Sequence, residues 1–228
     1  MRNEKNTIAF MKEKITLEKL KEEAYVFCDL QSKVNHVSLI GVTDGKAVGT
    51  YVEHAFQNYL ASKYEIIIGS SANGIDLPSA DILTDIKVTS ITQPQSSCPF
   101  RSSRQKIFGL GYNLLVFVYE KKDTESTCTL NFKYCTFISK ERTADYTITR
   151  RLIEMHSDGA NKEDIIAFLS DKNIPGDEII YENLADEILQ HLPLQGYLTI
   201  SNALQWRLQY SRVISLKNKV NGILNYER

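Results

Sequence analysis

The chain has 228 residues, of which 43% are hydrophobic and 24% are charged, and its formal net charge is −1. This length suits one α/β domain with an appended subdomain, or two small domains, in an ordinary globular protein. The chain has no apolar run of about 18 residues and no signal-peptide core, so we exclude a membrane protein and predict a cytoplasmic one. Its four cysteines form no CxxC pair, which argues against a zinc site.

The first part of the chain is predicted to be helical. Residues 1–35 form a rough apolar stripe that suits a packing helix or a dimer element. Residues 49–60 are predicted to form an amphipathic helix that packs through Val52, Phe56 and Leu60. Residues 64–68, which are rich in isoleucine, are predicted to form a buried strand.

Residues 81–89 alternate in polarity and are predicted to form the strand on which the chain's chemistry depends. Asp85 and Lys87 lie on one face of this strand, roughly 7 Å apart along it. A carboxylate that holds a divalent cation beside an ammonium suits metal-assisted attack on a phosphodiester. Asp76 is our choice for the second carboxylate, provided that the turn at Pro78 is offset, and Asp81 is the alternative.

Asp76, followed by Asp85-Ile86-Lys87, resembles the D…(D/E)-x-K signature of the PD-(D/E)xK nuclease superfamily. The surroundings are most similar to type II restriction endonucleases. The proline that often precedes the first aspartate in that superfamily is replaced here by Ile75. The alternative explanation of the motif is an exposed strand whose aspartate and lysine merely form an ion pair.

The resemblance implies a role for each of these residues. Asp76 and Asp85 would bind Mg²⁺, and Lys87 would orient or deprotonate the attacking water. In that superfamily the helix before the catalytic strands often carries a supporting glutamate, and Glu53 matches it in type and order.

The segment after this strand is predicted to begin with a loop at residues 92–101 and to continue with a short helix capped by Ser103. Four polar side chains of this segment are predicted to contact DNA phosphates: Arg101, Arg104, Gln105 and Lys106. Strands are predicted at residues 112–120 and 127–139. The expected fold is α/β, with a mixed central β-sheet flanked by helices in a PD-(D/E)xK restriction-endonuclease-like core.

The remainder of the chain is predicted to be an all-helical C-terminal subdomain, with helices at residues 144–156, 162–171 and 177–191. Isoleucines and leucines of these helices, among them Ile179, Ile180 and Leu189, are expected to pack against one another. Residues 153–187 are strongly acidic, whereas residues 188–226 contain no acidic side chain. This asymmetry suits one solvent-facing side and one phosphate-facing side.

Residues 202–212 are predicted to form a helix that reads base edges in the major groove. Its candidate DNA-binding side chains are Gln205, Arg207, Gln209 and Arg212. The alternative is an ordinary amphipathic helix with Trp206 and Tyr210 in the core. Arg150 and Arg151 are further candidates for phosphate contacts.

The sequence thus predicts a catalytic domain at residues 1–140 and a subdomain for DNA recognition or dimerisation at residues 141–228. We expect a Mg²⁺-dependent type II restriction endonuclease that cuts double-stranded DNA at a palindrome as a homodimer, without a nucleotide cofactor or a membrane partner. Two alternatives remain: another PD-(D/E)xK nuclease that acts in repair, nicking or junction cleavage, and a non-catalytic DNA-binding protein with the same fold.

Overall fold

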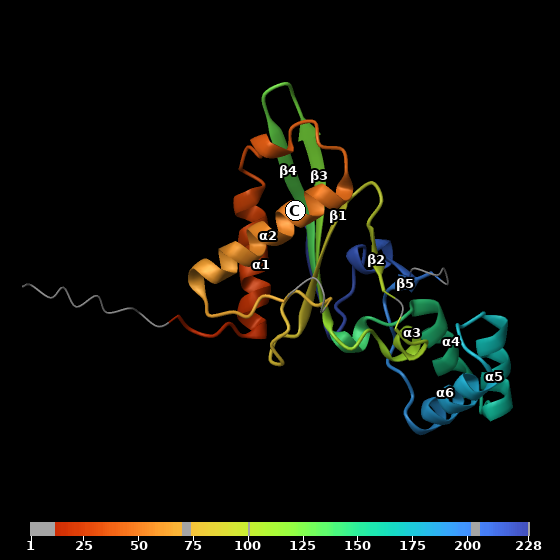
Figure 1. Cartoon of the computed structure of the whole chain (residues 1–228). Coiled ribbons are helices and arrows are strands. Elements are labelled where there is room, and N and C mark those ends of the chain that lie inside the picture. Colours follow the sequence, from red (N-terminus) through yellow and green to blue (C-terminus); the bar gives the residue numbers. More distant parts are fainter. Residues whose placement is uncertain (1–11, 70–73, 100, 202–205, 228) are drawn as a thin grey trace, which may run out of the picture.

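A computed structural model describes residues 12–69, 74–99, 101–201 and 206–227 (Figure 1). Its centre is a four-stranded mixed sheet in the order β1-β3-β4-β7. The strands are β1 (Thr84–Ser90), β3 (Asn113–Asp123), β4 (Cys128–Ile138) and β7 (Ile223–Glu227). β1 pairs in parallel with β3, and the other neighbours are antiparallel. β1 is therefore an edge strand of this sheet.

One face of the central sheet is covered by α1 (Leu17–Gln31) and α2 (Gly45–Lys63), which are joined through the short 3₁₀ helix η1 (Val37–Leu39) (Figure 1). α2 crosses β1 and α1 crosses β4. Phe27, Phe56, Phe117 and Phe132 meet in edge-to-face or tilted ring contacts in the core between them. Truncating any one of them to alanine would cost about 3–5 kcal/mol, so this core fixes α2 against β1.

The other face of the central sheet is covered by a small antiparallel sheet in the order β2-β6-β5. Its strands are β2 (Gln95–Cys98), β6 (Trp206–Gln209) and β5 (Thr199–Ile200), and the short helix α7 (Ser211–Ile214) follows β6. Trp206, Leu208 and Tyr210 are fully buried against the strand β3. By packing between the two sheets, these large side chains stabilise the position of the small sheet on the central one.

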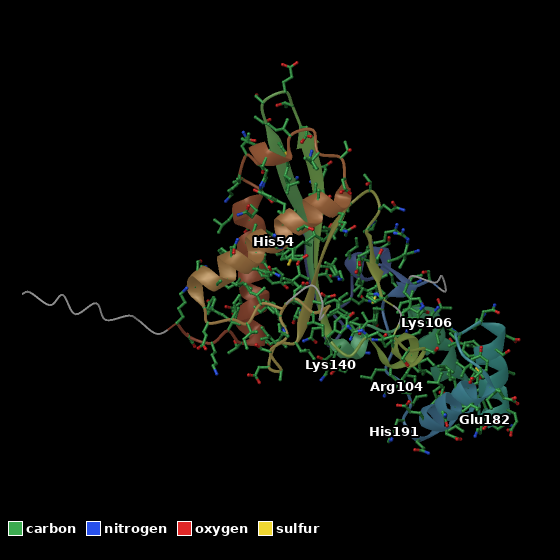
Figure 2. The ribbon with its side chains drawn as sticks, viewed as in Figure 1. His54, Arg104, Lys106, Lys140, Glu182 and His191 are labelled. Atoms are coloured by element: carbon green, nitrogen blue, oxygen red, sulfur yellow. The ribbon has the colours of Figure 1, made fainter. Side chains whose placement is uncertain are left out.

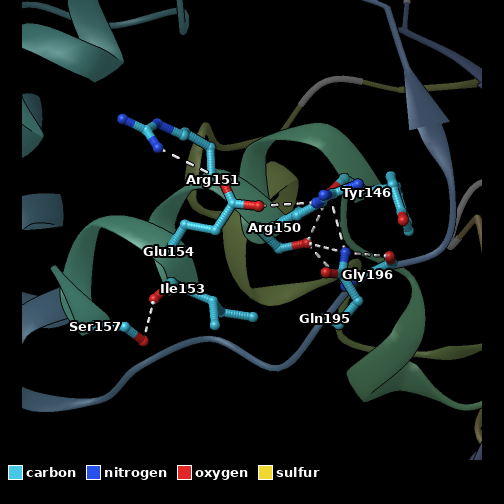
Figure 3. Close-up of polar contacts among 9 residues, drawn as sticks. Tyr146, Arg150, Arg151, Ile153, Glu154, Ser157, Gln195 and Gly196 are labelled. Atoms are coloured by element: carbon cyan, nitrogen blue, oxygen red, sulfur yellow. Dashed lines mark hydrogen bonds and ion pairs between the residues drawn. The ribbon is translucent and has the colours of Figure 1, made fainter.

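A helical lobe lies beyond the small sheet (Figure 1) and consists of α4 (Tyr146–Ser157), α5 (Lys162–Asp171) and α6 (Glu178–Gln190), packed with the short α3 (Arg104–Phe108). The 3₁₀ helix η2 (Lys140–Arg142) leads into it. Asn161 and Asp164 form a capping box that starts α5. The Gln195 amide donates to the Tyr146 carbonyl and so ties the chain after α6 to α4 (Figure 3).

Most predicted elements are confirmed, but several predictions are wrong. Residues 64–68 form no strand, because only Glu65 makes an isolated bridge and Ile67 is 61% exposed. Within the region predicted to be helical at residues 1–35, the structure forms the helix α1 at Leu17–Gln31. Residues 1–11 lie outside the described residues. β2 occupies part of the predicted loop at 92–101.

The C-terminal part is not all-helical, because it contributes β5, β6 and β7. In particular, residues 206–209 form a strand rather than the predicted recognition helix; residues 202–205 lie outside the described residues. Ile179, Ile180 and Leu189 are exposed on α6 instead of packing in the lobe. The division of the chain at residue 140 stays a prediction. None of the described helices is long and apolar enough to cross a lipid bilayer.

Candidate active site

The strand β1 carries Asp85 and Lys87 at the edge of the central sheet. In the parallel register, Asp85 lies opposite Leu114 and Lys87 opposite Val116, both of which are fully buried. Asp85 is 3% exposed, and its Oδ2 lies 2.7 Å from the Lys87 Nζ. The buried Asp85 and the partly buried Lys87 therefore form an ion pair on one face of the strand, as their spacing predicts.

Asp76 lies beside Asp85 because the intervening turn is offset. Leu77 and Thr84 exchange two backbone hydrogen bonds of 3.0 Å, which sets the preceding Asp76 opposite Asp85. The Asp76 Oδ2 also accepts a 2.7 Å hydrogen bond from the Ile86 backbone N–H. Asp81 lies in the turn itself and is exposed. The geometry thus brings Asp76, rather than Asp81, to the Asp85–Lys87 pair.

Glu53 reaches the same place from α2. Burial, together with the neighbouring Asp76 carboxylate, raises the pKa of Glu53 to about 7. His54, the next residue on α2, is exposed (Figure 2). Glu53 therefore joins the acidic group, whereas its neighbour along the helix faces solvent.

The pKa values of Asp85 and Lys87 depend on burial and on their charged neighbours. Burial raises the pKa of Asp85 to about 7, and hydrogen bonding to Asp76 acts in the same direction against the effect of Lys87. Burial is the largest single effect on Lys87 and disfavours its ammonium, but attraction and hydrogen bonding to Asp85, together with the charge of Asp76, outweigh burial and raise the pKa of Lys87. Glu53 and Asp85, each with a pKa raised to about 7, therefore form part of a site that a cation would stabilise.

The donor set suits a small divalent cation with an incomplete protein shell. Among the described residues, no three His, Cys, Asp or Glu side chains gather closely enough to hold one metal ion. Mg²⁺ does not need such a cage, because it is usually bound by one or two carboxylates together with waters and substrate phosphate oxygens. Asp76 and Asp85 provide that pair, so the residues fit a Mg²⁺ site completed by substrate.

An open cleft of about 610 Å³ adjoins this group and is lined by Glu53 and Lys87, whereas Asp76 and Asp85 lie beside it without lining it. One wall is the start of α2, which contributes Lys46, Thr50 and Glu53, and the floor is β1 with Lys87. The opposite wall is the small sheet, which contributes β2 and Arg207 of β6. A charged substrate in this cleft would contact Lys87 and the small sheet together.

Of the predicted phosphate contacts after β1, three do not face the acidic group. The Arg104 guanidinium pairs with both carboxylate oxygens of Glu187 at 2.6–2.9 Å. The Gln105 amide donates to the Leu110 carbonyl, and Lys106 is 3% exposed, where burial lowers its pKa. Arg104 and Lys106 lie next to the helical lobe (Figure 2). Ser103 provides no side-chain cap, because its hydroxyl donates to the Pro175 carbonyl.

Arg101 lies nearer to the acidic group. Gly74 has a positive φ of 66°, and a Cβ added there would lie 3.2 Å from the Arg101 guanidinium. Because Gly74 is two residues before Asp76, this contact places the exposed Arg101 beside the segment that supplies the second carboxylate.

Of the four predicted base-reading residues, the structure describes three, and they differ in their surroundings. Gln205 lies outside the described residues, whereas Arg207 and Gln209 are exposed on β6. The Arg212 guanidinium stacks on the Tyr146 ring at 3.8 Å, which orients it toward the lobe.

Arg150 and Arg151 both form ion pairs with Glu154 on α4 (Figure 3). Neither side chain is among those that line the cleft.

Sequence reasoning did not identify Gln95 and Ser97, which line the cleft from β2. The two prolines around them favoured a loop. The signal that was available is the alternation from Trp206 to Tyr210, whose period of two predicts a strand that needs a partner.

Comparison with known proteins identifies the family of the chain. A family model described as type II restriction enzyme NspV matches residues 14–225. The type II restriction enzyme NspV of Nostoc sp. (strain ATCC 29411 / PCC 7524) is 55% identical over 216 residues, which cover 94% of this chain and 97% of that protein. No solved structure gave a significant match.

The protein is therefore a type II restriction enzyme, a site-specific deoxyribonuclease. More narrowly, the chain belongs to the type II restriction enzyme NspV family. The size of the chain suggests the rare cutter SwaI as the individual relative, but the comparisons support NspV instead.

Proposed function

We propose that the protein is a Mg²⁺-dependent endonuclease that hydrolyses phosphodiester bonds of double-stranded DNA at a specific palindromic sequence in the cytoplasm. The observation that carries this proposal is the group formed by Asp76, Asp85 and Lys87 beside an open cleft. By resemblance to PD-(D/E)xK nucleases, the products would carry 5′-phosphate and 3′-hydroxyl ends. Family membership supports site-specific DNA cleavage, and the geometry suggests the chemistry.

Asp76 and Asp85 would hold the Mg²⁺. The bound cation would supply Lewis-acid polarisation of the phosphate and a more acidic water. The backbone N–H of Ile86 fixes the Asp76 carboxylate, which reduces the entropy lost when a ligand is bound there. Leu77 and Thr84 hold the two aspartate segments together in the same way.

Lys87 would act on the nucleophile and the phosphate. Its ammonium lies 2.7 Å from Asp85 on the floor of the cleft and keeps a raised pKa there. A protonated Lys87 would orient the attacking water and stabilise negative charge on the phosphate oxygens. Deprotonation of the water by Lys87 is the alternative, and it requires that the ion pair with Asp85 first be weakened.

Glu53 would support Asp76 from α2. With its pKa near 7, Glu53 can share a proton with Asp76 when the site is empty and release it when a cation binds. Arg101, Arg207 and Gln209 are the predicted DNA contacts that the geometry favours. We also propose a homodimer, because two-fold symmetry of the protein would match the two-fold symmetry of a palindrome.

The direct test is digestion of a defined genomic DNA by the native protein and by Lys87→Ala, each with and without Mg²⁺. Discrete fragments from the native protein alone, and only with Mg²⁺, are expected. A smear would indicate a nuclease without sequence preference. Intact DNA under every metal tried, with retained duplex binding, would overturn the catalytic proposal and favour a DNA-binding module.

A further inference from the structure

The small sheet has one apolar and one polar face. Its apolar face packs on the central sheet through Trp206, Leu208 and Ile200. Its opposite face, here called the polar face, consists of Gln95, Ser97, Thr199, Arg207 and Gln209. Each of these side chains can form hydrogen bonds and none is acidic. A sheet of only three short strands that presents such a surface suits contact with a polar, anionic partner.

The strand register arranges the polar face in two rows. Gln95, Gln209 and Thr199 lie opposite one another in the first row, and Ser97 lies opposite Arg207 in the second. Strands lie about 4.8 Å apart and the rows about 7 Å apart. The row spacing is about twice the 3.4 Å step between successive bases of one DNA strand. The two rows would therefore meet base pairs that are two steps apart.

The polar face is available for a ligand. In the described part of the chain, the side chains of Gln95, Arg207 and Gln209 form no hydrogen bond or ion pair. By contrast, Arg104 is held by Glu187. The exposed Arg207 and Gln209 and the half-buried Gln95 are not engaged by their own protein, so their side chains keep their capacity for bidentate contacts.

From this arrangement we infer that the small sheet enters the major groove of DNA and reads base edges through its polar face. The inference rests on the proposed function, since it names how the same cleft selects its substrate. The major groove is about 12 Å wide and admits an α-helix or a two-stranded β-ribbon, and β2 and β6 form such an antiparallel pair. Arg207 pairs with guanine O6 and N7, whereas Gln95 and Gln209 pair with adenine N6 and N7.

The polar face is also fixed relative to the chemistry. Thr89 lies two residues after Lys87 on the same face of β1, and its hydroxyl accepts a 3.1 Å hydrogen bond from the Gln95 backbone N–H. Ser97 and Arg207 line the cleft together with Lys87. Base reading at the polar face thus sets where the DNA backbone lies over Asp85 and Lys87.

The test is selection of bound duplexes from a randomised DNA library by the full-length protein, in metal-free buffer and with Ca²⁺. Four variants are compared: Arg207→Ala, Arg207→Lys, Gln209→Ala and the control Gln190→Ala, an exposed glutamine on α6. Gln209→Ala is expected to lose about 10- to 100-fold of discrimination at an A·T pair of each half-site. Arg207→Lys is expected to lose a similar factor at a G·C pair while binding to random DNA is unchanged.

Three outcomes would overturn the inference. The first is that Gln209→Ala and Arg207→Ala keep the base preferences of the native protein. The second is that these variants bind all sequences more weakly by the same factor, which would indicate phosphate contacts. The third is that the native protein selects no sequence. Selection of a sequence that the protein then fails to cut with Mg²⁺ would support the inference and contradict the proposed catalysis. Thermal unfolding of each variant distinguishes lost contacts from lost folding.

Discussion

Replacing Glu53 with glutamine is expected to stabilise the protein in alkaline solution and to impair cleavage. In the folded protein, burial and Asp76 raise the pKa of Glu53 from 4.5 to about 7. A carboxyl with a raised pKa stabilises the fold below its unfolded pKa, and that stability is lost as the pH rises through the folded pKa. The loss for Glu53 therefore falls between about pH 4.5 and pH 7.

The size of the effect follows from the shift. At about 1.4 kcal/mol per pKa unit, the full shift corresponds to about 3 kcal/mol. Because Glu53 is partly open to the solvent of the cleft, we expect about half of this. Glu53→Gln should then be more stable than the native protein by about 1–2 kcal/mol at pH 8. At pH 4, where the native carboxyl is neutral, the two should be equal.

Urea denaturation at pH 4, 6 and 8 measures this difference, and Glu125→Gln, in the exposed turn between β3 and β4, is the matched control. Addition of Mg²⁺ should remove most of the gain, because a cation at Asp76 and Asp85 offsets the repulsion that glutamine relieves. A variant that is equally or less stable than the native protein at pH 8 would refute the reasoning. So would a gain that does not depend on pH.

Two further predictions concern the second carboxylate and the N-terminal helices. Asp76→Ala should lower the cleavage rate by about 100-fold or more, whereas Asp81→Ala should change it by less than about twofold; equal losses in a cleavage assay would contradict the assignment. Burial opposes the charge of Glu23, but donors on Lys63, Tyr59 and Tyr64 outweigh it and lower its pKa to about 2. Glu23→Gln should lower the free energy of unfolding by about 1–2 kcal/mol at pH 7, and this difference should disappear as the pH falls from 4.5 to about 2. Thermal unfolding that shows the same loss of stability at every pH would refute this.

Sequence reasoning succeeded where local patterns and tertiary structure agree. The helices α4, α5 and α6 and the strands β3 and β4 have long periodic patterns and clear end signals, and they were predicted within a few residues. The Asp85 and Lys87 pair was predictable because side chains two residues apart on a strand share a face.

It failed where distant contacts decide the structure. Ile66, Ile67 and Ile68 have strong β propensity, but the described structure has only an isolated bridge between Lys14 and Glu65 there. These isoleucines therefore form no strand, because β propensity depends on pairing with a neighbouring strand. The pairing of Arg104 with Glu187 joins residues far apart in the chain and has no local signal. The choice of Asp76 over Asp81, by contrast, was made from the sequence on the condition of an offset turn, and the bridge between Leu77 and Thr84 provides that offset.

The hydrogen bond between Thr89 and Gln95 has a consequence for how this enzyme can change. Gln95, which would read a base, and Lys87, which would act on the backbone, belong to one short strand–turn–strand unit, and Arg207 and Gln209 are held by pairing of β6 with the second strand of that unit. A new target sequence would therefore not be obtained by grafting a foreign recognition segment, because the graft would also displace Lys87. Altered specificity in this family should instead arise by point replacements on the polar face, with the turn between β1 and β2 kept at constant length.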